Sequence, residues 1–290
     1  MRVGRRPNRT LMLLTVALAL TTALGAQTIT LPNQKNSVHF AVIGDTGSGS
    51  AQQYRIGERL AAARAVFPYD IVLMLGDNIY GGSDARDFAD KFEKPYKSLL
   101  DGSVKFYASL GNHDNTNERL YKPFNMNGER YYTFKPSNGS VRFFALDSNY
   151  MDRAQLAWLD KELANSGSDW KICYFHHPIY SSGKTHGSDL RLRTQLEPLF
   201  IKYGVNVVLA GHDHFYERIK PQHGIQYFVS GAGGQLRPGD VRRSDLTEKA
   251  FDTGYHFILF EIADDTLFFQ AISDQGQTVD SGAITRLKQT

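Results

Sequence analysis

Apolar runs and amphipathic stretches alternate over the first two thirds of the chain. Residues 38–43 are mostly apolar, residues 51–66 carry apolar side chains near helical spacing, and residues 71–75 form a second apolar run. A short apolar run is typical of a buried strand, whereas a period near 3.6 indicates a helix. The chain is therefore expected to open with a strand–helix–strand unit.

Similar patterns continue to the C-terminal end and define the remaining elements. Helices are predicted at 84–99, 152–164 and 190–203, and strands at 105–110, 130–136, 141–146, 170–175, 205–210, 225–230, 255–262, 266–273 and 278–284. Early strand–helix alternation followed by an antiparallel tail favours an α/β fold. The sequence thus predicts a four-layer α-β-β-α sandwich of two mixed sheets flanked by helices.

Five polar motifs each follow an apolar run. They are Gly44-Asp45-Thr46-Gly47, Gly76-Asp77-Asn78-Ile79-Tyr80, Gly111-Asn112-His113-Asp114, His176-His177-Pro178 and Gly211-His212-Asp213-His214. Neighbouring strand ends converge in α/β folds, so side chains in these loops are expected to meet. Carboxylate, phenol, carboxamide and imidazole groups suit iron, zinc or manganese. The motifs therefore predict a site for two metal ions.

The oxygen-bearing residues are expected to differ in role. Asp45 directly follows a strand and is a natural terminal ligand, whereas Asp77 could bridge the two cations, which repel each other and need an anion between them. The phenol of Tyr80 would bind near neutral pH only beside a strongly acidic cation such as ferric iron. Asn112 offers a neutral carboxamide oxygen to the second cation.

The histidines are assigned from their spacing. His212 and His214 lie two residues apart, so in an extended segment both rings can face one metal pair. By the same rule the adjacent His176 and His177 are not expected to point into one pocket, and His176 is taken as the ligand.

Three further residues are candidates for the reaction itself. His113 is expected to face the substrate, and Asp114 either orients that imidazole or caps the loop that follows. His186 lies in a loop rich in small residues shortly after the His176 strand, from which it could reach the mouth of the site.

Residues 1–26 have the composition of a secretory signal. Four arginines without an acid precede an apolar stretch at 11–24 and then small residues. The apolar stretch is too short to favour a membrane span, and a retained N-terminal anchor is the alternative to cleavage. We expect residues 27–290 to form a single catalytic domain that is secreted or periplasmic and has no stable membrane span once the signal is removed.

Charge and cysteine content narrow the class of partners. The chain has 33 basic and 30 acidic residues, but the signal holds four of the basic ones, so the mature charge is about −1. No basic run or aromatic–basic interleaving remains, and nucleic acid is therefore not an expected partner. The single cysteine, Cys173, allows no internal disulfide and is expected to be buried and inert. The sequence predicts no particular oligomeric state.

In this order and spacing, the five motifs resemble those of the calcineurin-like metallophosphoesterases, and within them the short, single-domain purple (tartrate-resistant type) acid phosphatases. Tyr80 distinguishes the purple acid phosphatases from other members of this family, because related phosphodiesterases and calcineurin-type phosphatases generally lack a tyrosine ligand at that place. The runs 212–218 and 230–234 also resemble purple phosphatase motifs.

The resemblance implies a division of the ligands between two cations. Fe³⁺ would be held by Asp45, Asp77, Tyr80 and His214, and Fe²⁺, Zn²⁺ or Mn²⁺ by Asp77, Asn112, His176 and His212. His113 and His186 would then face the phosphate.

The expected activity is hydrolysis of a small phosphomonoester by attack of a metal-bound hydroxide, as in an acid phosphatase. A phosphodiesterase or nucleotidase with the same metals is the nearest alternative. An inactive metal-binding protein on the same scaffold is a third possibility.

Overall fold

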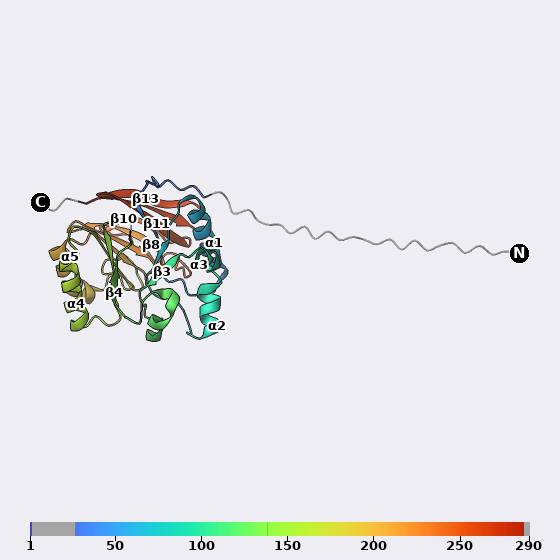
Figure 1. The fold of residues 1–290 in the computed structure, drawn as a ribbon, viewed down its shortest axis with the longest axis horizontal. Coiled ribbons are helices and arrows are strands. Elements are labelled where there is room, and N and C mark those ends of the chain that lie inside the picture. The colour runs from blue at the N-terminus through green and yellow to red at the C-terminus, as the bar shows by residue number, and fades with distance from the viewer. Residues whose placement is uncertain (2–26, 138, 287–290) are drawn as a thin grey trace.

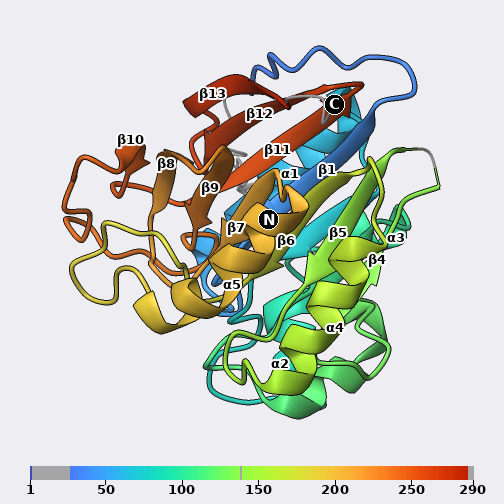
Figure 2. The ribbon, with the colours of Figure 1, turned by 90° about the vertical axis from the view of Figure 1, so that its left-hand side faces the viewer.

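The computed structural model describes residues 1, 27–137 and 139–286, so the signal assigned to residues 1–26 lies outside them except for Met1. The chain forms two mixed sheets (Figures 1 and 2). The first runs in the order β13 (Thr278–Thr285), β12 (Thr266–Ser273), β11 (His256–Ala263), β1 (Val38–Ile43), β2 (Ile71–Met74) and β3 (Lys105–Ala108). The second runs β10 (Thr247–Phe251), β8 (Tyr216–Gln222), β9 (Ile225–Ser230), β7 (Val207–Ala210), β6 (Trp170–Phe175), β5 (Val141–Ala145) and β4 (Tyr132–Phe134).

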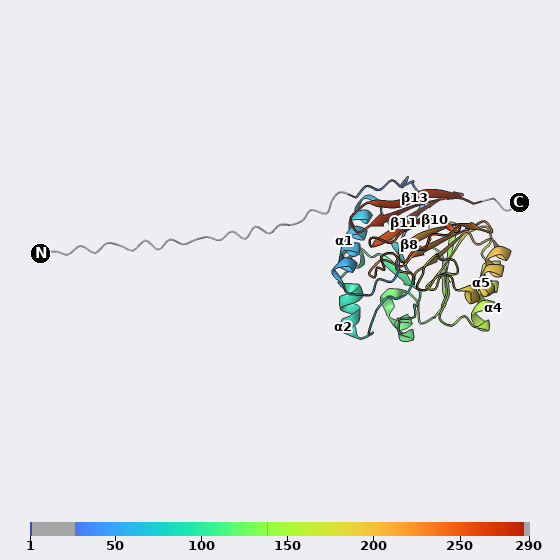
Figure 3. The same ribbon diagram turned by 180° about the vertical axis from the view of Figure 1, so that it is seen from behind.

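Helices cover the outer face of each sheet, so the predicted four-layer sandwich is confirmed. α1 (Ala51–Val66) and α3 (Lys97–Asp101) lie on one side, and α4 (Arg153–Ala164) and α5 (Leu190–Tyr203) on the other, as Figures 1 and 3 show from opposite directions. Separate buried clusters fill the space under each helical layer and the space between the sheets.

The alternation along β1 shows how sequence selects these layers. Phe40 and Val42 belong to the cluster between the sheets, whereas Ala41 and Ile43 belong to the cluster under α1. Successive strand side chains point to opposite faces, so a continuous apolar run buries both. Phe40 also stacks on Phe260 of its own sheet and meets Phe143 of the other edge-on, with ring centroids 5.0 and 5.1 Å apart.

Parallel strands form the centre of each sheet. β1, β2 and β3 run parallel, as do β5, β6, β7 and β9. Their carboxyl ends consequently face the same edge of the sandwich, which is where the polar motifs begin.

The single helix predicted at 84–99 is wrong in detail. The chain instead forms α2 (Ala85–Phe88), a π-helical turn at Ala89–Glu93 and then α3. Pro95 has no N–H to donate to the carbonyl of Lys91 four residues earlier, and the side chain of Gln53 on α1 donates to that carbonyl instead. A contact with a distant helix therefore replaces a bond that a continuous helix would have made.

Two strands were not predicted, β8 and β10. β8 contains Pro221 and the charged pair Glu217-Arg218, a pattern that does not indicate a buried strand. Glu217 is nevertheless fully buried, because it accepts hydrogen bonds from the Ser182 backbone at 2.8 Å and the Thr247 hydroxyl at 2.6 Å.

Among the described residues, no helix combines the length and apolar character that crossing a bilayer requires.

Candidate metal centre

The two sheets bring all seven expected ligands to one edge of the sandwich. Loops after β1, β2 and β3 of the first sheet supply the oxygen donors Asp45, Asp77, Tyr80 and Asn112. Loops after β6 and β7 of the second sheet supply the nitrogen donors His176, His212 and His214. Each sheet thus contributes a different kind of donor.

Three of these residues have left-handed backbone conformations. The φ angles of Asp45, Asp77 and His212 are +54°, +50° and +69°, and each residue directly follows a glycine at a strand end. Such conformations cost on the order of 1–3 kcal/mol each and concentrate at functional sites, although Asp and His tolerate them better than bulky residues do. The strained positions here coincide with the expected ligands.

Glycines allow the loops to approach closely. A Cβ atom on Gly111 would lie 2.2 Å from Oδ1 of Asp77, and one on Gly211 would lie 2.5 Å from Oδ2 of Asp45. Any side chain at either position would displace a carboxylate from the site.

One group of donors forms around Asp45. Asp45, Asp77 and His214 place ligand atoms within 4.8 Å of one another. The Tyr80 hydroxyl lies 3.3 Å from Oδ1 of Asp45 and 3.4 Å from Nε2 of His214. Two carboxylates, a phenol and an imidazole thus surround one position.

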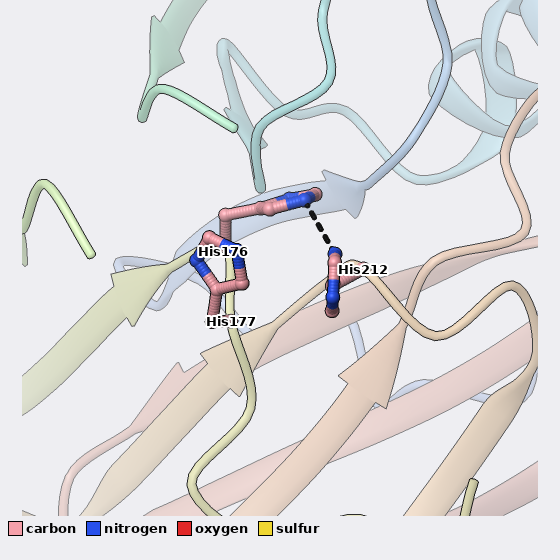
Figure 4. A group of neighbouring side chains, drawn as sticks. All are labelled: His176, His177 and His212. Carbon is pink, nitrogen blue, oxygen red and sulfur yellow. Dashed lines mark hydrogen bonds between the residues drawn. The ribbon is translucent and has the colours of Figure 1, made fainter. Parts of the chain in front are cut away.

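A second group forms around His176, with His177 and His212 beside it (Figure 4). Nδ1 of His176 lies 2.9 Å from the Leu75 carbonyl, which can only accept, so that nitrogen carries the proton. Burial lowers the pKa of His176 well below its ordinary value, so the ring is neutral and its Nε2 is a bare acceptor. This Nε2 nevertheless lies 3.0 Å from Oδ1 of Asn112 and 3.0 Å from Nδ1 of His212. The Nε2 of His176 and the Oδ1 of Asn112 are both acceptors, so no proton joins them. Their short separation is explained if a cation binds to both.

Asp77 connects the two groups. Its Oδ1 lies 3.4 Å from Nε2 of His176 and accepts the His113 backbone N–H at 2.9 Å. Its Oδ2 is buried and has no hydrogen-bond partner in the described part of the chain. A buried carboxylate with a free oxygen between two donor groups has the position of a bridging ligand.

The electrostatics of the site favour bound cations. Burial raises the pKa of the Asp45 carboxyl well above its ordinary value, and the nearby Asp77 charge raises it further. Burial also lowers the pKa values of His212 and His214, which keeps both rings neutral and able to bind metal. Excess negative charge and bare imidazole nitrogens therefore meet at one place, and the residues present fit a pair of metal ions.

His113 and His186 lie at the open side of this centre, and both are exposed. The His113 ring has its centroid 5.0 Å from that of Tyr80, next to the first donor group. The His186 ring lies against His212, next to the second, with centroids 4.1 Å apart.

Asp114 makes other contacts than those expected. Its carboxylate accepts hydrogen bonds from the backbone of Gly111, Asn78 and Ile79 and from the Asn78 side chain, at 2.6 to 3.0 Å. None of these bonds orients the His113 ring or caps the following loop, where the Asn115 side chain is the cap. Asp114 instead ties the loop after β3 to the loop after β2.

His177 was excluded from the pocket by the alternation rule, and this expectation is wrong. Its ligand nitrogen lies within 4.8 Å of those of His176 and His212. Pairing of β6 with β7 ends at Phe175, so the two histidines lie beyond the regular strand and the rule no longer applies. Nδ1 of His177 lies 2.9 Å from the Ser148 hydroxyl, which holds the ring beside the centre.

Comparison with known proteins agrees with this geometry. Residues 38–216 match the family model described as calcineurin-like phosphoesterase. Pig tartrate-resistant acid phosphatase type 5 is 29% identical over 269 residues, covering 79% of each chain.

Two solved structures share the fold. GAP50 of Plasmodium, described as the anchor in the inner membrane complex, superposes with a TM-score of 0.75 at 19% identity, over 88% of this chain and 90% of that one. The purple acid phosphatase PPD1 from yellow lupin seeds superposes with a TM-score of 0.71 at 20% identity, over 89% and 55%.

The chain belongs to the calcineurin-like phosphoesterase family. Proteins of this family hydrolyse phosphoesters with bound metal ions, and the relatives of this chain include acid phosphatases.

The metal-free protein should lose stability as pH rises from about 4 to 7. Burial and the Asp77 charge raise the pKa of Asp114 to about 7, and Asp45 shifts in the same direction. In this window the folded protein holds protons that the unfolded chain has released, so the free energy of unfolding falls with pH. We expect a loss of about 1–3 kcal/mol, measured by urea unfolding in the presence of a chelator.

Zinc-loaded protein supplies the comparison, because bound cations would take the place of the Asp45 proton and offset the Asp77 charge, and should therefore reduce the loss. Asp114→Asn should reduce the slope most in the metal-free protein. Equal pH dependence with and without zinc would contradict this account of the site.

Proposed function

We propose that the protein is an exported acid phosphatase that hydrolyses small phosphomonoesters with two bound metal ions. The observation that carries the proposal is the position of Asp77, whose carboxylate joins an oxygen-rich group around Asp45 to an imidazole-rich group around His176. Export is inferred from the composition of residues 1–26.

The proposed ligand sets differ in chemical hardness. Asp45, Asp77, Tyr80 and His214 would hold ferric iron, and Asp77, Asn112, His176 and His212 a divalent iron, zinc or manganese ion. Burial and the charge of Asp45 raise the pKa of Tyr80 above its ordinary value, so only a strongly acidic cation would keep the phenol ionised. Ferric iron meets this requirement better than zinc or manganese.

When bound, such a pair supplies a water molecule of lowered pKa and positive charge against the phosphoryl oxygens. The chain supplies the remaining functions. Asp77 would keep the two metal ions at a fixed distance from each other. Its carboxylate also accepts a hydrogen bond from the His113 backbone N–H, which fixes the position of the His113 backbone beside the site. The exposed imidazoles of His113 and His186 would bind the phosphate and donate a proton to the departing oxygen.

The relatives support a monoester substrate more than a diester. The similar pig protein is named as an acid phosphatase, and the lupin protein of the same fold as a purple acid phosphatase. A phosphodiesterase or nucleotidase would use the same donors, so rates on paired substrates must distinguish them.

Purified, metal-loaded protein should hydrolyse p-nitrophenyl phosphate at least about tenfold faster than bis-p-nitrophenyl phosphate. His113→Ala should lower turnover about 100-fold while metal content, measured by mass spectrometry, stays within the error of the wild type. Asp77→Ala should lose both metal and activity, because no other carboxylate within residues 27–137 and 139–286 joins the two donor groups.

His223→Ala is the matched control for these variants, since this side chain is 58% exposed and lies outside the donor groups. A faster diester rate would replace the monoesterase with a diesterase on the same site. Equal metal loss in the His113 and Asp77 variants would contradict the roles assigned to them.

The oxidised iron-loaded protein should be violet, because a tyrosinate bound to ferric iron gives a charge-transfer band. Tyr80→Phe should remove this band while the fold, followed by circular dichroism, is retained. Tyr96→Phe is a suitable control, because this buried tyrosine lies in the cluster under α1. An active protein that is colourless and binds only zinc or manganese would exclude the iron assignment and leave the rest of the site intact.

A further inference from the structure

The loop that carries His186 lies directly over a buried carboxylate. Residues 181–188 form part of the connection between β6 and α5, and His186 is exposed on this loop. Asp213 is completely buried and lies between His212 and His214 in the loop after β7.

Several contacts join this carboxylate to the loop. The Ser181 hydroxyl donates to Oδ2 of Asp213, and the same hydroxyl accepts the Gly183 backbone N–H at 3.1 Å. Ser181 is also tied to Ser188, because its N–H donates to the Ser188 hydroxyl at 2.9 Å and its carbonyl accepts from that hydroxyl at 3.1 Å. Asp213 therefore holds Ser181, and through it both ends of the segment that carries His186.

The packing against Gly183 shows how tight this arrangement is. A Cβ atom on Gly183 would lie 2.6 Å from each carboxylate oxygen and 2.7 Å from Cγ of Asp213. Real Cβ atoms do not approach other atoms so closely, so the carboxylate occupies the space that any other residue at 183 would need.

Asp213 is itself fixed to the metal centre. Its N–H donates to the Gly211 carbonyl at 2.8 Å, and its own carbonyl accepts from Phe215 at 2.7 Å. These short turns hold His212 and His214 on either side of it, so one tight segment contacts both the expected ligands and the His186 loop.

We propose that Asp213 is a positioning residue that sets the distance between the His186 imidazole and the metal centre. This inference rests on the proposed function, since it assigns a reaction role to His186. The far side of the loop has separate supports, because Thr185 donates to Asp240 at 2.6 Å and the Ser182 N–H donates to Glu217 at 2.8 Å. Of these contacts, only the one with Asp213 joins the loop to the segment that carries His212 and His214.

The test compares Asp213→Asn, His186→Ala and the double variant in metal-loaded protein, with p-nitrophenyl phosphate and an alkyl phosphate as substrates. Asp213→Asn should lower kcat about 10- to 100-fold for the alkyl phosphate, whose poor leaving group needs a proton, and less than about fivefold for p-nitrophenyl phosphate. KM and metal content should stay within about twofold of the wild type. In the His186→Ala background the second change should add less than about twofold, because both act through one imidazole.

Two further variants separate positioning from loss of charge. Gly183→Ala should displace the carboxylate without altering any charge and should reproduce the leaving-group dependence. Asp101→Asn removes an exposed charge at the end of α3, remote from this loop, and should leave every measurement unchanged. Hydrogen–deuterium exchange of residues 181–188 should accelerate in Asp213→Asn, which reports on the loop independently of turnover.

Additive losses in the double variant, or metal loss in Asp213→Asn, would overturn the proposal in favour of direct support for the ligands. An unchanged leaving-group dependence or unchanged exchange would also overturn it. In one further outcome, the metal-loaded wild type hydrolyses no phosphomonoester while hydrogen–deuterium exchange of residues 181–188 still accelerates in Asp213→Asn. That result would overturn the proposed function and the reaction role of His186, and would leave only the structural contact between Asp213 and the loop.

Discussion

Repulsion between two buried carboxylates is the constraint on which the rest of the structure depends. Asp45 and Asp77 follow the neighbouring parallel strands β1 and β2, so the register of the sheet brings the two carboxyl groups together and opposes ionisation of both. Burial of an uncompensated charge costs several kcal/mol, and a second like charge adds to that cost. The packed sandwich holds the two side chains in place against this repulsion, and cations bound between them would offset it.

Much of this arrangement is predictable from the sequence because it depends on local signals. An apolar run followed by glycine and a polar residue marks a strand end, and the strands found at Val38–Ile43, Ile71–Met74 and Val207–Ala210 have those signals. The order of the motifs then indicates which residues meet, since parallel strands present their carboxyl ends at one edge.

What the sequence did not predict depends on distant contacts. The helix expected at 84–99 breaks at Pro95, which has no N–H for the Lys91 carbonyl, and Gln53 of another helix satisfies that carbonyl instead. β8 is not recognisable in the sequence because it contains the buried Glu217. The hydrogen-bond donors to this side chain, Ser182 and Thr247, lie 35 and 30 residues away along the chain. Asp114 likewise binds backbone groups of the preceding loop, and no local pattern shows such a partner.

The division of donors between the sheets gives the packing of the core a direct part in the chemistry. The first sheet supplies the oxygen donors and the second the nitrogen donors, and each donor group needs both. The distance between the sheets, set by contacts such as Phe40 with Phe143, therefore fixes how far His176 and His214 lie from Asp77 and Asp45. Protein interiors are packed too densely to absorb a change of even one methylene without movement. Substitutions between the sheets should consequently alter metal geometry as well as stability, whereas substitutions under α1 or α5 act on one set of donors at a time.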